Sequence, residues 1–174
     1  MTTTRTVTFE YEASPGDVAA LLQDPVFLRH RSESAGETNI DVRVEPENGG
    51  TRVTVSREKN VDVPAFAKPI LGSARKATER TLWRPSGDTW LAEYSIDVGG
   101  VPVKAQGKST LAPSATGCKY TSTFEITAKI PLVGKKIEEF VAEGLVEQLL
   151  QNAQRNAQGL ARSAPRGAHS LIDG

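Results

Sequence analysis

The sequence predicts an α+β domain in which a curved antiparallel sheet of about seven strands wraps around one long C-terminal helix. Short runs of alternating apolar and polar residues are separated by turn signals, and a helical pattern of roughly 28–30 residues follows Pro131. A long amphipathic helix that follows several strands must lie across the sheet, because neither surface can bury its apolar face alone. We therefore expect helix and sheet to enclose an interior.

The first elements are a strand and two short helices. Residues 6–11 alternate between polar and apolar side chains, as in a half-buried strand. The run Ser-Pro-Gly-Asp at 14–17 is a helix start, because its serine can cap the helix and its proline suits the first turn. Asp24-Pro25 interrupts this helix, and the apolar residues after it predict a second one that ends near Gly36.

About six strands then follow in quick succession. The alternating segments 40–45 and 53–55 flank Asn48-Gly49-Gly50, a tight-turn signal in which both central positions need positive φ. The next strand, at about 74–83, lacks clean alternation and its register stays open. The remaining strands alternate cleanly and complete an antiparallel meander: residues 90–98, 101–111 and 117–130.

The long helix combines an apolar stripe with a polar final part. We expect the stripe to face the sheet. It consists of Val133, Ile137, Phe140, Val141, Leu145 and Leu149, with Gly144 among them. A second row packs on the two short helices or forms a self-association surface: Ala142, Val146, Leu150, Ala153 and Ala157. The prediction is one domain over residues 1–163 and a mobile tail over 164–174, which has little to bury.

The composition argues against several classes of protein. The 174 residues carry 21 basic and 21 acidic side chains, so no net charge steers the protein toward nucleic acid. A single cysteine suits a reducing compartment. The N-terminal residues lack an apolar run, and no stretch approaches the roughly 20 apolar residues of a membrane span. We expect a cytoplasmic protein that binds no nucleic acid and does not insert stably into membranes.

The element order resembles the helix-grip fold of the START-like (SRPBCC) superfamily from about residue 3 to 162. Within it, Val-Pro-Ala-Phe-Ala-Lys at 63–68, followed by Glu79 and Trp83, is similar to an uncharacterised bacterial branch. The resemblance implies a cavity between sheet and helix that holds a lipid, a polyketide or another apolar molecule. Some branches are cyclases or hydratases, some carry lipids and some act through protein partners. It therefore implies architecture more firmly than activity.

Small residues on the inferred core face of the last strands predict that this cavity exists, because interiors do not normally leave volume unfilled. Two tyrosine hydroxyls there are available to orient the polar end of a ligand. The alternative is that Gly107 and Gly144 permit close packing against Trp83, Trp90 or Phe140. The predicted lining is Tyr94, Ala105, Gly107, Tyr120, Phe124, Phe140, Val141 and Gly144, with Phe66 as a gate.

The connection at residues 61–72 is unusually apolar for a loop, and its two prolines argue against a strand. Three interpretations stay open for its segment 64–71: a lid over the cavity mouth, a patch that touches a membrane or a partner, and a short helix that closes the core. The flanking cations Lys68, Arg75 and Lys76 give only weak attraction to a membrane.

Arg57 and Glu79 are candidates for a polar anchor. Arg57 keeps the inward parity of its strand, and Glu79 shares the parity of Trp83. If both point inward, they can bind a ligand carboxylate or hydroxyl. A buried pair is costly unless it is fully hydrogen-bonded, so such an arrangement indicates function. The alternative is that the strand ends before Arg57 and leaves it solvated.

Catalytic signals are sparse. His30 and His169 are the only histidines and Cys118 is the only cysteine, so the sequence predicts neither a metal site nor a cofactor. Our leading hypothesis is binding or transport of an apolar small molecule. The alternatives are a cofactor-free enzyme of the cyclase or hydratase kind, working through Tyr, Arg and Glu, and an interaction module that uses the 64–71 loop or forms a weak homodimer.

Overall fold

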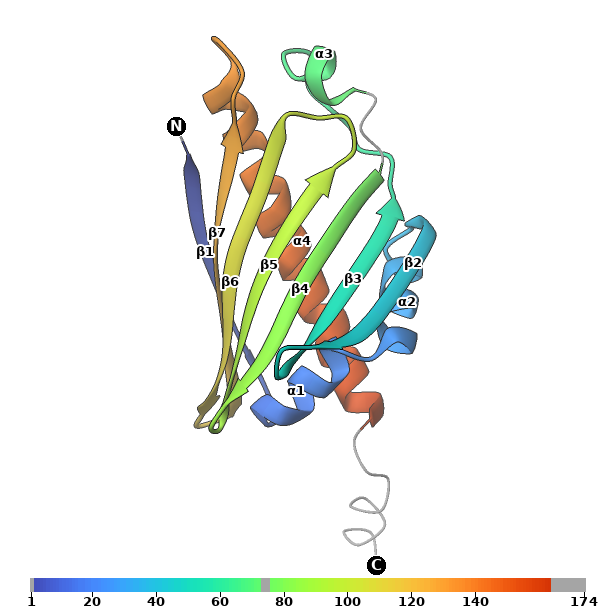
Figure 1. Ribbon diagram of the computed structural model, residues 1–174, viewed down its shortest axis with the longest axis vertical. Coiled ribbons are helices and arrows are strands. Elements are labelled where there is room, and N and C mark those ends of the chain that lie inside the picture. Colours follow the sequence, from blue (N-terminus) through green and yellow to red (C-terminus); the bar gives the residue numbers. More distant parts are fainter. Residues whose placement is uncertain (1, 73–75, 164–174) are drawn as a thin grey trace, which may run out of the picture.

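A computed structural model describes residues 2–72 and 76–163. The expected mobile tail, with His169, and Arg75 lie outside the described residues. The architecture is a seven-stranded antiparallel sheet in the order β1-β7-β6-β5-β4-β3-β2, crossed by one long helix (Figure 1). The predicted fold class is confirmed. The strands are β1 (Thr3–Tyr11), β2 (Thr38–Glu47), β3 (Gly50–Glu58), β4 (Lys76–Ser86), β5 (Thr89–Val98), β6 (Val103–Ser114) and β7 (Gly117–Ala128).

The helices follow the capping signals of the sequence. They are α1 (Pro15–Leu22), α2 (Pro25–Ser34), α3 (Lys68–Leu71) and α4 (Gly134–Ser163). The Ser14 side chain accepts a hydrogen bond from the Asp17 backbone at 3.1 Å, and the Asp24 carboxylate caps α2 in the same way. Among the described residues, no helix combines the length and the apolar character that a membrane span requires.

The β2–β3 hairpin has the predicted tight turn. Asn48 and Gly49 both have positive φ, 43° and 76°, which is the backbone that matches the twist of the flanking strands. The structure also supplies the register of β4, in which Glu79 pairs with Val55 on one side and with Ile96 on the other. Glu79 therefore lies on the concave face of the sheet.

The apolar core forms two clusters under the sheet. One lies beneath α1 and α2 and includes Val18, Leu28, Trp83 and Leu111. The other lies between α3, α4 and the opposite ends of the strands, and includes Phe124 and Ile137.

The 64–71 connection contributes to the second cluster. Its last four residues form the single turn α3. Leu71 in this turn and Ala67, which directly precedes it as the N-cap, are buried. Of the interpretations left open by the sequence, the structure shows the short helix that closes the core.

Glu138 fixes α4 against one edge of the sheet. The helix makes its closest approach to β1 and β7. There the buried Glu138 carboxylate, 1% exposed, accepts hydrogen bonds from Thr3 Oγ1 at 2.9 Å and from the Ala128 backbone N–H at 3.0 Å. Ala142, one turn further along, is fully buried and lets the helix lie close.

Replacing Glu138 with alanine is expected to lower the free energy of unfolding by about 2–3 kcal/mol, because a buried backbone N–H and a hydroxyl lose their acceptor. Glu138→Gln keeps one acceptor oxygen and is expected to lose less. Urea unfolding followed by circular dichroism measures both changes. Equal effects of the two variants would contradict a role for these hydrogen bonds.

Candidate functional site

Two adjoining hollows, which we call the outer and the inner chamber, lie between the sheet and α4. The outer chamber has a volume of about 430 Å³ and lies among α4, the ends of β3–β6 and the segment 59–63. Its walls are mostly apolar and carry Ala105, Phe140, Val141 and Gly144. Four residues of the predicted lining therefore lie on one hollow.

The inner chamber is smaller, about 80 Å³, and more polar. It is lined by all three tyrosines of the chain, Tyr11, Tyr94 and Tyr120, together with Glu79 and Arg31. Ile96, Leu145 and Gln148 line both chambers, so the two spaces adjoin.

The glycines at 107 and 144 play opposite roles. A Cβ on Gly107 would lie 2.4 Å from Cζ of Tyr94, so this glycine makes room for the tyrosine ring and leaves no free volume. A Cβ on Gly144 would meet nothing within 4 Å. Gly144 is exposed at the open side of the outer chamber, so it reveals no enclosed volume, whereas Gly107 fits the alternative of close packing, with Tyr94 as the partner.

A network of hydroxyl groups closes the floor of the inner chamber. Tyr94 Oη lies 2.8 Å from Ser122 Oγ, and Tyr120 Oη lies 3.1 Å from Ser109 Oγ. Ser109 donates to Ser122 at 3.1 Å and joins the two pairs. The Tyr120 ring stacks on Phe9, with centroids 5.4 Å apart. The two tyrosines are thus held in fixed positions by their hydroxyl partners.

Asn156 of α4 forms a second polar link at the other end of the chamber. Its Nδ2 donates to Tyr11 Oη at 3.2 Å, and its Oδ1 accepts from Arg31 Nη1 at 3.1 Å. Neither Asn156 nor Arg31 was singled out from the sequence. Asn156 lay in the polar final part of the helix, and no signal distinguished it from its exposed neighbours.

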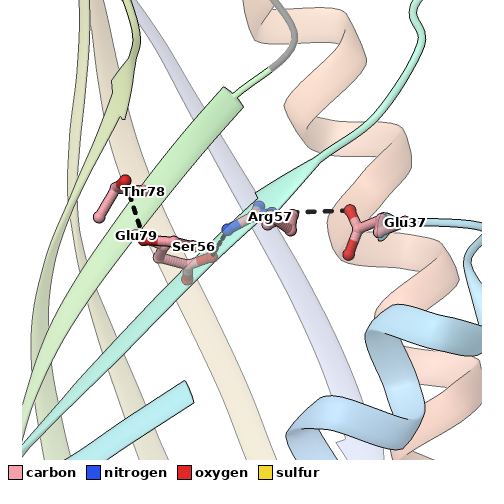
Figure 2. Close-up of polar contacts among 5 residues, drawn as sticks. All are labelled: Glu37, Ser56, Arg57, Thr78 and Glu79. Carbon is pink, nitrogen blue, oxygen red and sulfur yellow. Dashed lines mark hydrogen bonds and ion pairs between the residues drawn. The ribbon is translucent and has the colours of Figure 1, made fainter. Parts of the chain in front are cut away.

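Arg57 lies between two carboxylates at the junction of the chambers (Figure 2). Its Nη1 is 3.3 Å from Glu79 Oε2 and its Nε is 3.5 Å from Glu37 Oε2. The side chains of Arg57 and Glu37 are 6% and 9% exposed, and that of Glu79 is 29% exposed. The predicted pair thus forms inside the protein, and Glu37 is a third member that the sequence did not indicate, because it lies in a connection with no strand parity.

The other predicted residues lie elsewhere. Phe124 is fully buried in the core cluster beside α4 and lines neither chamber. Phe66 also lines neither chamber, and its ring contacts Phe140 edge to face with centroids 6.5 Å apart. Cys118 is a buried core residue and His30 is exposed. In the described part of the chain, no group of three or more metal-ligating side chains comes together.

The tyrosines are expected to resist ionisation while the protein is folded. Burial raises the pKa of Tyr11 to about 12 and raises the pKa of Tyr94 and of Tyr120. Unfolded tyrosine titrates near pH 10, so folded-state stability is complete below about pH 10 and falls as the pH rises further. Absorbance at 295 nm should show little tyrosinate at pH 10.5. If all three tyrosines were ionised at pH 10.5 while the circular dichroism remained native, the burial of their hydroxyl groups would be contradicted.

Removing the Arg57 guanidinium is expected to destabilise the fold strongly. Arg57→Met leaves Glu37 and Glu79 close together without a cation, and breaking a buried pair in this way costs about 3–5 kcal/mol. The double variant Arg57→Met/Glu37→Gln should recover part of that loss, because the most buried carboxylate is then neutral. Urea unfolding measures both. No recovery in the double variant would show that the two side chains are not coupled.

Comparison with solved structures supports the fold. The protein TTHA0849 from Thermus thermophilus superimposes with a TM-score of 0.61 at 13% identity, over 95% of this chain and 100% of that chain. A norcoclaurine synthase point mutant from Thalictrum flavum gives 0.59 at 15% identity, over 95% and 98%. Ara h 8.0201 gives 0.59 at 10% identity, over 94% and 100%. The last two belong to the START-like helix-grip superfamily. At these identities, the likeness shows the fold alone.

No curated protein matches the sequence. A family described as "Protein of unknown function (DUF2505)" matches residues 6–158, which is most of the chain. This protein therefore belongs to the DUF2505 family.

Proposed function

We propose that this protein binds a small amphipathic molecule, with the apolar body in the outer chamber and a hydrogen-bonding end directed at the inner chamber. The observation that carries the proposal is the outer chamber itself, a space of about 430 Å³ with mostly apolar walls between α4 and the sheet. Close-packed interiors rarely keep such space without a use. We also infer membership of the START-like superfamily, from the fold and the element order.

The chemistry of the chambers supports an oriented ligand. The outer chamber is lined mainly by aliphatic and aromatic side chains, and its volume of about 430 Å³ falls within the usual range of small-molecule sites. The inner chamber offers tyrosine hydroxyls and the Gln148 amide, which lines both chambers. A ligand with one polar end matches both environments, because the paired hydroxyls of the inner chamber keep acceptor lone pairs that an incoming donor can use.

The ligands of one structural neighbour suggest a class of molecule for this protein. One norcoclaurine synthase structure holds dopamine and hydroxybenzaldehyde. Such molecules have an aromatic body and a polar end, and this protein has corresponding surfaces in its two chambers. Reversible binding or transport of a lipid or polyketide-like compound accords with the same arrangement.

A second candidate function is a cofactor-free reaction of the cyclase or hydratase kind. Glu79 favours it, because this carboxylate lines the inner chamber beside the tyrosines and is held by Arg57. A positioned carboxylate and a phenol can move protons on a bound ligand. Incubation with an identified ligand and analysis of the products distinguishes the two functions. An unchanged ligand supports binding alone.

The test of binding uses Gly144. Gly144→Phe places a ring in the outer chamber and is expected to abolish binding of 1-anilinonaphthalene-8-sulfonate and of co-purifying ligands seen by native mass spectrometry. Gly144→Ala adds only a methyl group in open space and is expected to keep binding while stabilising α4 by up to about 1 kcal/mol. Fluorescence of Trp83, which is buried in the inner chamber wall, reports occupancy independently.

A second variant that narrows the outer chamber controls for local misfolding of Gly144→Phe. Ala105→Leu enlarges a side chain on the opposite wall of the same chamber. Binding that is unaffected by both Gly144→Phe and Ala105→Leu would refute the chamber as the binding site.

A further inference from the structure

A separate hollow of about 500 Å³ lies on the surface between α2 and α4. Its two walls are single helix faces, because the lining residues recur at spacings of three and four along each helix. The α2 wall consists of Phe27, His30, Arg31 and Ser34. The α4 wall consists of Gln151, Gln154, Arg155, Gln158 and Arg162. We call this hollow the α2–α4 groove.

Two contacts fix the base of the α2–α4 groove. A Cβ on Gly159 would lie 2.4 Å from Cε1 of Phe27, so the helices approach closely there only because residue 159 is glycine. Close by, Arg31 Nη1 donates to Asn156 Oδ1 at 3.1 Å. The groove therefore has a defined spacing between its walls, held by packing and by a hydrogen bond.

The charge of the α2–α4 groove is unbalanced. Its lining contains three arginines and no aspartate or glutamate. Within residues 2–72 and 76–163, none of the three forms an ion pair. Elsewhere in the same chain, Arg43, Arg52, Arg57 and Arg80 each pair with a carboxylate. At one edge of the groove, Gln151 donates to Glu147 at 3.3 Å.

Helix dipoles account for only part of this arrangement. Arg31 and Arg162 lie in the last turns of α2 and α4, where a cation is favourable. Arg155 lies two turns before the end of α4, where that effect has faded. Burial also lowers the pKa of Arg31, because its guanidinium has lost hydration. The carboxylates of Glu79 and Glu37 offset part of that loss, and an anion bound in the groove would offset more of it.

We propose that the α2–α4 groove binds a small organic phosphate, with the phosphate between Arg31, Arg155 and Arg162. Guanidinium groups bind phosphate through paired N–H donors, and a set of three suits a dianion better than a single carboxylate. The volume exceeds that of inorganic phosphate, and the glutamines and Phe27 offer contacts to an attached organic group. This site shares Arg31 with the wall of the inner chamber, but it does not depend on the function proposed for the chambers.

The test is isothermal titration of the full-length protein with inorganic phosphate, glycerol 3-phosphate, adenosine 5′-monophosphate and, as an uncharged control, adenosine. Vesicles of phosphatidylcholine with and without phosphatidic acid show whether a lipid headgroup supplies the phosphate instead. Saturable binding of at least one phosphate, and none of adenosine, is expected. Arg155→Gln/Arg162→Gln should weaken it about tenfold or more, since charge-assisted hydrogen bonds are lost.

A matched control removes the same charge outside the groove. Arg29→Gln/Arg43→Gln changes two exposed arginines that do not line the groove, and it should bind phosphate as the unaltered protein does. Equal weakening in the two double variants would overturn the proposal, because it would indicate a general charge effect. Absence of saturable binding of every phosphate at millimolar concentration, with vesicles also unbound, would overturn it as well.

Discussion

The attachment of α4 along one edge of the sheet is the constraint on which the rest of the structure depends. Glu138 binds a hydroxyl of β1 and a backbone N–H of β7, and Ala142 lets the helix lie close. A straight helix fixed to one edge of a curved sheet must diverge from the middle strands. The space that opens there is the outer chamber, whose helical wall is Phe140, Val141 and Gly144.

The diverging space is closed at its deep end by polar groups. Hydroxyls of Tyr94 and Tyr120 are satisfied by serines on neighbouring strands, and Arg57 is neutralised by two carboxylates. A buried polar network of this kind stabilises only when its members are paired, so each partner limits the positions that the others can adopt. The result is a chamber with apolar walls at its mouth and fixed hydrogen-bonding groups at its base.

Sequence periodicity predicted the sheet, the long helix and the hairpin turn, because these follow from local chemistry. It also made Arg57 and Glu79 candidates for one inward pair, although the register of the strand that carries Glu79 stayed open. It could not separate Gly107 from Gly144, since the pattern assigned both to a core face, whereas in the structure Gly107 packs against the Tyr94 ring and Gly144 is exposed. The sequence could not identify Glu138 and Asn156 as buried residues, for a related reason. A polar residue on a helix becomes recognisable as buried only when its hydrogen-bond partners, 135 and 145 residues away, are known.

Arg31 and Arg57 both lie at the boundary of the inner space, yet their surroundings differ in charge. Arg57 has two carboxylates within ion-pairing distance, so its charge is neutralised within the fold. Arg31 has an amide oxygen as its hydrogen-bond partner, which uses one of five N–H donors, and the carboxylates of Glu79 and Glu37 favour its charge from beyond ion-pair distance. A protein that needed only structural closure could have used a neutral residue at position 31 at less desolvation cost. The anion proposed for the α2–α4 groove would add to these carboxylates a partner for Arg31 from outside the chain.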